Sequence, residues 1–166
     1  MLPAQRTVTL TYTPSLVRQS AWAFWKRSVG ITWPLTLVLL TAYVVLLVRG
    51  GNTGWLVGVF GTIVALGYVY LAAVYVAHLR HGMATLRAMG SPHGTLEVED
   101  SGITVASGAG QSKLPWSRVQ EVWFYPGFWI LLFSRTQFMT LPLDNLPEAM
   151  QAEILERVRQ QGGKTH

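Results

Sequence analysis

Cysteine is absent from the 166-residue chain, which excludes disulfide bonds, thiolate catalysis and cysteine-based metal sites. Charged residues are also scarce, at 13% of the sequence, whereas hydrophobic residues make up 50%. This balance lies on the membrane side of ordinary soluble-protein usage. Acidic residues are missing from the first 93 positions, which carry seven Lys or Arg residues. The positive charge therefore surrounds an apolar segment and does not form the basic patch of a nucleic-acid-binding protein.

Two long apolar runs, Val29–Val48 and Trp55–Ala77, dominate the first half of the chain, and only residues 49–54 separate them. Neither run contains a charged residue. Each has the length of about 20 residues that a helix needs to cross a hydrocarbon core of about 30 Å. We therefore predict two transmembrane helices, 29–48 and 55–77, joined by an external loop at 49–54. Because no ionisable side chain lies at membrane depth, we expect an anchor and not an ion pathway.

The cations around the two runs predict the orientation of this hairpin. Lys and Arg residues mark the cytoplasmic side of a membrane span. The cations that flank the runs are Arg18, Lys26, Arg27, Arg80 and Arg87, and the loop between the runs contains only Arg49. We therefore expect a multi-pass membrane protein with both termini in the cytoplasm.

Small residues recur along one face of the second run. They are Gly54, Gly58, Gly61, Ala65 and Ala72. Small residues at such spacing let two helix backbones approach closely in lipid. The stripe predicts close packing against the first run of the same chain, and it leaves open packing against a second copy in a homodimer.

Residues 1–28 precede the first run and are predicted to form a strand and then a helix. Thr7–Thr13 alternates threonine with apolar residues, which favours a strand. Ser15–Ser28 is predicted to be a helix that either lies in the membrane interface or extends the first transmembrane helix into the cytoplasm. Indole rings and cations favour the headgroup level. The residues predicted to contact the lipid interface are Trp22, Trp25, Lys26, Arg27, Arg80 and Arg87.

Residues 78–93 are predicted to continue the second helix out of the membrane and to end in a linker. From 94 to 166 the hydrophobic pattern changes to a period of two, with turn signals about every eight to twelve residues, one of them at 134–136. We predict an antiparallel β-barrel of about seven strands, which the N-terminal strand joins, capped by an amphipathic helix at Pro147–Gln160. The fold class is a transmembrane two-helix hairpin with a soluble, cytosolic α+β domain.

Several short motifs accompany this architecture: Tyr12-Thr13-Pro14 after the first strand, the aromatic run Trp22–Trp25, the stretch Leu114–Val122 and the pair Leu141-Pro142. Together with the two-span hairpin, they resemble the YcxB-like family of small bacterial membrane proteins. The resemblance implies a pleckstrin-homology-like (PH-like) barrel over residues 94–166 and a location in the bacterial inner membrane. It implies no reaction.

Candidate reactive groups are few. His78 and His81 stand three residues apart on a predicted helix, a spacing compatible with metal ligation, but no carboxylate or cysteine lies nearby to complete a site. Glu97 and Glu99 share one face of a predicted strand, where paired carboxylates serve either acid–base chemistry or solubility. We predict no catalytic residue, no metal site and no cofactor.

The aromatic stretch 123–129 offers a different kind of site. Neighbouring residues in a strand face opposite sides, so consecutive aromatic rings cannot all point inward. If Phe124 faces the core, then Trp123 and Tyr125 face outward. Exposed aromatic residues are enriched at partner surfaces, although the same rings would also suit a contact with the membrane or with the N-terminal helix. The residues predicted to bind a partner are Trp123, Tyr125, Phe128 and Trp129.

These observations favour a non-enzymatic membrane protein whose cytosolic domain is a protein-binding module. A narrower hypothesis is an immunity protein that neutralises a membrane-acting toxin. The alternative is a sensor of anionic lipid or a regulatory membrane protein, with an enzyme that acts on lipid as a third class. The expected partners are the bilayer, a protein and a second copy, with no nucleic acid. The cations considered for lipid sensing are Arg80, Arg87, Lys113 and Arg118.

Overall fold

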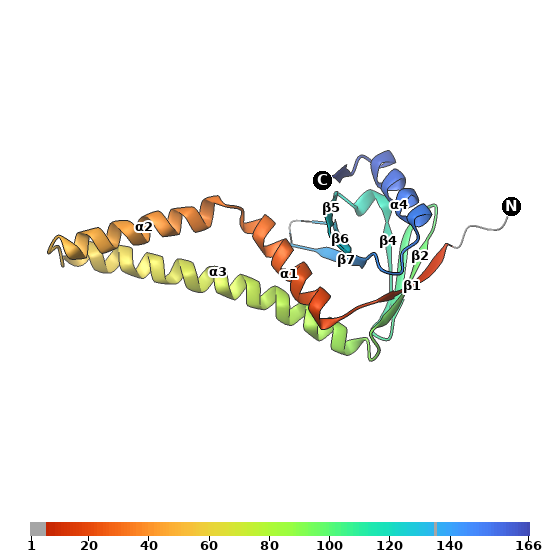
Figure 1. Ribbon diagram of the computed structural model, residues 1–166, viewed down its shortest axis with the longest axis horizontal. Coiled ribbons are helices and arrows are strands. Elements are labelled where there is room, and N and C mark those ends of the chain that lie inside the picture. Colours follow the sequence, from red (N-terminus) through yellow and green to blue (C-terminus); the bar gives the residue numbers. More distant parts are fainter. Residues whose placement is uncertain (1–5, 135) are drawn as a thin grey trace. The chain divides into compact units, whose positions relative to one another are not determined.

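A computed structural model of the chain describes residues 6–134 and 136–166 (Figure 1). The first five residues of the predicted segment 1–28 lie outside the described residues, and so does Arg135 of the turn predicted at 134–136. The chain divides into two compact units. Ala21–Arg80 form the helical unit, and the segments before and after it together form the sheet unit.

The helical unit is built mainly from two long apolar helices, α2 (Thr32–Arg49) and α3 (Trp55–Ala88). The last turns of α3 extend beyond Arg80 into the sheet unit. Both helices are long and apolar enough to cross a membrane, and only 6% and 11% of their apolar windows are buried. This low burial distinguishes them from core helices of a soluble protein, and the predicted pair of long apolar helices is confirmed.

A separate helix, α1 (Pro14–Val29), precedes α2. The two helices are divided at Gly30, whose φ of 65° lies in the left-handed region that glycine adopts without a Cβ clash. Figure 1 shows the resulting change of direction between α1 and α2. The alternative in which this segment simply extends the first transmembrane helix is therefore wrong, because the helix is interrupted. The interfacial role of α1 stays a prediction.

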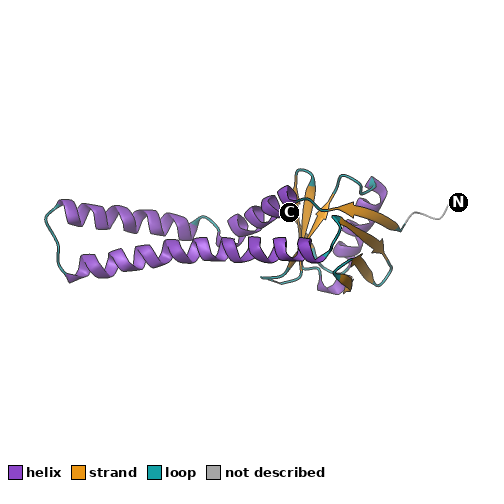
Figure 2. Cartoon of the chain, turned by 90° about the horizontal axis from the view of Figure 1, so that it is seen from below, coloured by secondary structure: helices purple, strands orange, loops and turns teal. Residues whose placement is uncertain are grey.

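The sheet unit contains two four-stranded sheets, which Figure 2 shows as orange arrows. The first sheet has the order β1-β2-β3-β4 and is antiparallel throughout. The second has the order β7-β6-β5-β8, and only its β5–β8 pair is parallel. The strands are β1 (Thr7–Thr11), β2 (His93–Val98), β3 (Gly102–Ser107), β4 (Gly110–Pro115), β5 (Glu121–Tyr125), β6 (Phe128–Leu132), β7 (Phe138–Pro142) and β8 (Lys164–Thr165).

The predicted closed barrel is wrong, because no ladder joins the two sheets within the part of the chain that the structure describes. Pro115 ends β4, and the short 3₁₀ helix η1 (Trp116–Arg118) turns the chain before β5 begins. The free edge of β5 is then taken by the residues after the last helix. Their backbone pairs with β5 through Lys164 and Thr165, and the amide of His166 donates to the carbonyl of Val122 over 2.9 Å. β5 therefore has no free edge with which β4 could pair, and the two sheets do not close into a barrel.

One hydrophobic core lies between the two sheets. The predicted amphipathic helix is present as α4 (Glu148–Gln160), and its buried residues Met150, Ile154 and Val158 belong to this core. β2 follows the predicted alternation, with Leu96 and Val98 fully buried. The fully buried members of the core are Leu10, Leu96, Val98, Ile103, Val122, Leu131, Leu141, Ile154 and Val158.

Side chains of Tyr12 and Asn145 connect β1 to the second sheet and its following turn. The Tyr12 hydroxyl donates a hydrogen bond of 3.3 Å to the carbonyl of Thr140 in β7. The amide of Asn145 donates to the Thr11 hydroxyl over 3.3 Å. β1 itself pairs with β2 along its whole length, so the prediction that the N-terminal strand joins the sheet is confirmed.

We expect Tyr12→Phe to weaken the sheet unit in a pH-dependent way. Loss of the bond to Thr140 should lower the free energy of unfolding by about 0.5–1.5 kcal/mol at neutral pH. Burial raises the pKa of Tyr12 to about 12, above its ordinary value of 10.0. The stabilisation from the protonated hydroxyl is therefore complete below about pH 10 and is lost as the pH rises through about 12. Thermal unfolding of the full chain in detergent, followed by tryptophan fluorescence, measures both effects.

The matched control is Tyr70→Phe, because Tyr70 is exposed on α3. That variant should unfold like the wild type at neutral pH and keep the wild-type alkaline destabilisation. Tyr12→Phe should instead show a smaller loss of stability between about pH 10 and 12. An identical alkaline loss in Tyr12→Phe and in the wild type would contradict the role given to Tyr12.

Candidate functional site

The aromatic residues predicted to bind a partner lie mostly inside the structure. Trp123, Phe128 and Trp129 are buried, with exposed fractions of 5%, 4% and 7%, and Tyr125 is half-buried. Phe124, whose inward orientation was the condition for an outward Trp123 and Tyr125, is 40% exposed. The outward orientation of Trp123 is therefore wrong, and Phe128 and Trp129 are both buried although neighbours in a strand face opposite sides.

The cause of this error is that the β5–β6 pair is buried on both faces. Every residue of β6 is buried, so the chain shows no alternation of inside and outside there. In β5, Val122 and Trp123 are adjacent, point to opposite faces, and are both buried. A strand that is buried on both faces has an unbroken apolar sequence, and such a sequence does not reveal which face meets solvent.

The exposed part of this aromatic stretch is the pair Phe124 and Tyr125, which we call the aromatic tip. The two rings are held by neighbours from β6. Phe124 meets Trp129 edge to face at 5.2 Å between ring centroids, and Tyr125 stacks on Phe128 at 5.2 Å. The turn that follows contains Gly127, whose φ of 82° lies in the left-handed region that favours glycine. The aromatic tip is thus a well-supported surface feature beside a tight turn.

A second group of aromatic rings lies in the helical unit, where the C-terminal half of α1 packs on α3. Trp22 and Trp25 stack at 5.0 Å, and Tyr75 meets their edges at 5.7 and 6.2 Å. The Trp25 indole also donates a hydrogen bond of 3.0 Å to the carbonyl of Leu71. These contacts fix the rings on α3 while leaving Trp22 51% exposed.

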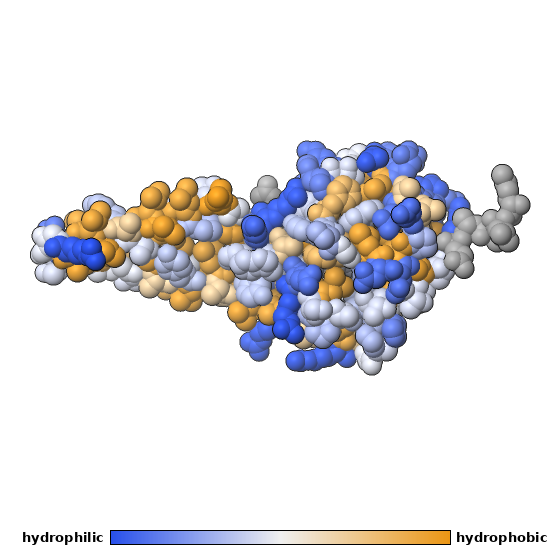
Figure 3. All heavy atoms as spheres, in the orientation of Figure 1, coloured by the Kyte–Doolittle hydropathy of each residue, from blue (hydrophilic) through white to orange (hydrophobic). Residues whose placement is uncertain are grey.

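Exposed cations accompany this aromatic cluster, and Lys26, Arg27 and Arg80 belong to the same unit. Arg87 is exposed on the part of α3 that belongs to the sheet unit. In Figure 3 hydrophobic residues cover much of the surface of α2 and α3. Aromatic rings and cations at one end of an apolar hairpin are the arrangement found at the headgroup level of membrane proteins.

The small-residue stripe does not form the contact between α2 and α3. A Cβ added at Gly54, Gly58 or Gly61 would meet no atom within 4 Å. The close approach uses Gly67 instead, where an added Cβ would lie 2.5 Å from a methyl group of Leu37. The predicted packing of the stripe on the first helix is therefore wrong for the three glycines. Ala65 and Ala72 are exposed, and packing against a second copy stays a prediction.

The histidines and carboxylates considered for chemistry occupy separate places. The His78 ring contacts Phe24 at 5.1 Å and shares a hydrogen bond of 2.8 Å with the carbonyl of Val74. His81 and Glu97 are exposed. Within residues 6–134 and 136–166, no cluster of three His, Asp or Glu side chains has the geometry of a metal site.

Glu99 is the centre of a polar network that joins β2, β3 and β4. Its carboxylate accepts hydrogen bonds from Lys113 at 2.5 Å and from Thr104 at 2.8 Å. The hydrogen bond from Lys113, and then that from Thr104, holds the pKa of Glu99 below its ordinary value. The Glu99 carbonyl also accepts the Trp116 indole over 2.9 Å. Lys113, one of the cations considered for lipid sensing, is therefore engaged by a carboxylate of its own sheet.

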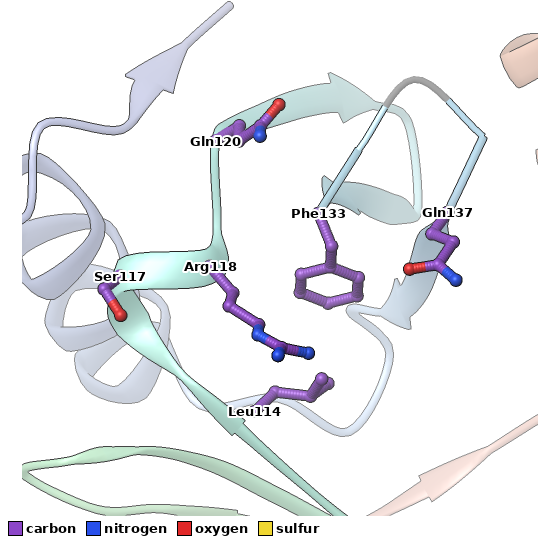
Figure 4. Close-up of a pocket in the computed structure, with 6 residues that line it drawn as sticks. All are labelled: Leu114, Ser117, Arg118, Gln120, Phe133 and Gln137. Atoms are coloured by element: carbon purple, nitrogen blue, oxygen red, sulfur yellow. The ribbon is translucent and has the colours of Figure 1, made fainter.

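A surface pocket of about 320 Å³ lies where η1 meets the loops of the second sheet (Figure 4). In Figure 4 the guanidinium of Arg118 and the amide of Gln137 enter this space from different elements, beside the Phe133 ring and Leu114. Among the described residues Arg118 forms no ion pair, and no carboxylate lines the pocket. The lining residues are Leu114, Ser117, Arg118, Gln120, Phe133 and Gln137.

Sequence reasoning named Arg118 as a possible lipid contact but did not identify this pocket. The available signal was a basic residue directly after the Pro115-Trp116-Ser117 break, with no acidic residue beside it. Nothing in the sequence placed Gln137 next to it, because that neighbour depends on how the β6–β7 hairpin folds back. The pocket thus combines one cation and polar side chains with the apolar Leu114 and Phe133.

Comparison with known proteins gives a match to a family model. No curated protein and no solved structure matches the chain. Residues 98–159 match the family model described as YcxB-like protein. The match runs from the last residue of β2 through the pocket and the aromatic tip into α4. The family resemblance predicted from the sequence is therefore confirmed, and the segment 98–159 is a YcxB-like region.

Proposed function

We propose that the chain is a non-enzymatic integral membrane protein in which the α2–α3 hairpin anchors a protein-binding sheet unit. The observation that carries this proposal is the exposed apolar surface of α2 and α3, beside a collar of tryptophan, tyrosine and basic residues. In water such a surface would expose far more apolar area than a soluble monomer tolerates. In a bilayer the same surface is satisfied by lipid.

We place the chain in the bacterial inner membrane on the family resemblance, and the distribution of charge supports an orientation with both termini in the cytoplasm. Arg18, Lys26 and Arg27 precede α2, and Arg80 and Arg87 follow the apolar part of α3. At the other end of the hairpin Arg49, the last residue of α2, is the single cation, and residues 50–54 carry none. Lys and Arg are retained on the cytoplasmic side, so the sheet unit belongs in the cytoplasm.

A binding role for the sheet unit is supported by the aromatic tip. It is also supported by the engagement of a candidate reactive group in structural hydrogen bonds. Phe124 and Tyr125 present aromatic surface next to a rigid turn, which is the composition of interface anchors. The carboxylate of Glu99 is engaged in structural hydrogen bonds with Lys113 and Thr104. Two mainly antiparallel sheets whose common core includes the buried face of α4 are compatible with the PH-like relationship, which we retain as part of the proposal.

The narrower version of this proposal is an immunity protein, whose partner is a toxin that acts at the membrane. Membrane anchoring would place the sheet unit where such a toxin arrives. The identity of the protein that contacts the aromatic tip decides between this version and any other protein partner.

Recognition of anionic lipid is the second candidate function, and the exposed Lys26 and Arg80 in the helical unit favour it. Each cation near an anionic surface contributes about 1 kcal/mol of attraction. The Trp22–Trp25–Tyr75 cluster lies on the same helices and holds them together at this end of the hairpin. Lipid binding here is compatible with protein binding elsewhere on the chain.

The anchor is tested by Leu39→Arg. Leu39 is 62% exposed near the middle of α2. A charged residue at the centre of a span disfavours insertion by about 2.5–3.5 kcal/mol. We expect a marked fall in the fraction of chain that resists alkaline extraction from membranes. Leu39→Phe is the matched control and should remain integral, whereas wild-type chain found in the soluble fraction would reject the anchor.

Protein binding is tested by a photo-crosslinking amino acid placed at position 125 or 124 in native membranes. We expect a discrete protein adduct from both positions, and none from position 95, which is exposed on β2. Mass spectrometry identifies the adduct. The double variant Phe124→Ser, Tyr125→Ser provides the loss-of-binding arm, because Trp123 is buried and its substitution would disturb the fold. The same adducts from position 95, or none from the tip, would argue against a partner at this surface.

Lipid recognition is tested by Lys26→Gln combined with Arg80→Gln. Native mass spectrometry of the purified chain reports bound phosphatidylglycerol. At about 1 kcal/mol for each cation, the double variant should bind this lipid about tenfold or more weakly. Arg159→Gln removes an exposed cation from α4 and should leave lipid binding unchanged. Equal binding by the wild type and the double variant would remove this candidate function.

A further inference from the structure

The free edge of β4 is an unused row of backbone hydrogen-bonding groups. β4 pairs with β3 from Gly110 to Pro115. On its other side, none of the backbone hydrogen bonds among the described residues reaches the strand. Alternate residues of a strand direct their N–H and C=O groups to each side, so about half of these groups in β4 point away from β3. All of its residues are exposed except Leu114, which is half-buried.

The other sheet edges of this unit are paired, crossed by side-chain hydrogen bonds, or short. The outer edge of β5 pairs with β8, and its Phe124 amide donates to the carbonyl of His166 over 3.0 Å. β1 and β7 are connected by the bond from Tyr12 to Thr140, and Asn145 reaches Thr11 from the turn after β7. β8 itself has only two residues. β4 is thus the long edge strand with room for another strand.

The Arg118 pocket lies at the end of this free edge. Leu114 of β4 is one of its lining residues, and Arg118 follows β4 directly in η1. Lys113 is already bound to Glu99 at 2.5 Å, so the positive charge left without a carboxylate partner at this end of β4 is that of Arg118. Gln120 and Gln137 add side-chain amide donors to the same pocket.

We propose that β4 accepts an extended segment of a protein partner as an additional strand, and that a carboxylate of this segment binds Arg118 in the pocket. The proposal rests on the proposed function of the sheet unit as a protein-binding module. A guanidinium fork matches a carboxylate in bidentate geometry. Main-chain bonds to β4 give affinity, and the pocket gives specificity for the acidic residue.

The combination of edge and pocket selects a peptide over the other occupants. A lipid headgroup would satisfy Arg118 but has no amide groups to pair with β4. A second copy of this chain, pairing β4 with β4, would bring no carboxylate, because the strand Gly110–Pro115 and η1 contain none. A volume of about 320 Å³ lies at the lower end of small-molecule sites and suits one side chain of a longer segment.

The test uses immobilised pools of peptides of about eight residues, which is within the usual length of a strand. One pool has capped ends and a fixed central Glu among Thr, Val, Ser and Tyr. A second pool has Gln in place of Glu. A third has Gln and a free C-terminal carboxylate, and a fourth repeats the Glu pool with every backbone amide methylated, which removes the donors from both edges of the peptide. Purified full chain in detergent is passed over each pool, and the retained amount is measured.

We expect the Glu pool to retain the chain at least about tenfold better than the capped Gln pool, the ratio produced by one lost charge-assisted hydrogen bond. Arg118→Gln should remove this difference, and Arg159→Gln, which changes an exposed cation outside the pocket, should preserve it. The methylated pool should not retain the chain, because it cannot pair with β4. Retention by the pool with a free C-terminal carboxylate would show that Arg118 binds the end of a partner chain. Retention by the Glu pool alone would show that Arg118 binds a side-chain carboxylate.

Equal retention by the Glu and Gln pools, no effect of Arg118→Gln, or retention by the methylated pool would each overturn the proposal. So would the absence of retention by every pool. Displacement of the chain by glycerol 3-phosphate at lower concentration than by soluble Glu peptides would assign the pocket to a lipid headgroup instead. A dimer in detergent that Arg118→Gln leaves intact and that excludes the peptides would assign the edge to a second copy.

These outcomes are distinguishable from a failure of the proposed function. Crosslinks at position 125 do not involve β4 or the pocket, because Tyr125 lies on β5. Failure of the peptide test with intact crosslinks at position 125 rejects the β4 site alone. Failure of both tests rejects the binding module together with its proposed edge.

Discussion

The parallel pairing between β5 and the last residues of the chain constrains the whole sheet unit. Lys164 and Thr165 occupy the edge of β5, and the backbone of His166 bonds to Val122 and Phe124. With that edge taken, β4 has no partner on its outer side, and the two sheets remain separate ladders around one core. The opening next to β4 is where Arg118 and its pocket lie. A short contact at the end of the sequence thus determines which surface of the unit can pair with another protein.

Much of this fold follows from local patterns. The two long apolar helices, the strand at Thr7–Thr11, the alternation of β2 and the amphipathic helix α4 were all predictable, because each has a periodicity that depends on its own sequence. Prediction failed where burial depends on distant partners. β6 is buried on both faces, so the apolar sequence around Trp123 and Trp129 gave no information about orientation. The barrel prediction failed because residues 164–166 showed no strand pattern of their own.

The candidate sites show the same division between local and long-range information. The sequence identified the collar of aromatic residues and cations, because its members lie beside the apolar runs. It placed the helix contact on a stripe of glycines, whereas the structure uses Gly67 against Leu37, a choice made by the side chain on the facing helix. The Arg118 pocket combines β4, η1 and the β6–β7 hairpin, and only the tertiary fold brings these segments together.

An anchored binding unit changes the affinity that its site requires. A strand added to an exposed edge, with one ion pair, is a small interface, and small interfaces bind weakly on their own. If the partner lies in or at the same membrane, the hairpin confines both proteins to one surface and raises their effective concentration, as a linker does between two modules. A weak edge site is then sufficient, and it releases the partner readily. The apolar hairpin and the open edge of β4 therefore act together, because the effective concentration that the hairpin provides compensates for the weak affinity of the edge site.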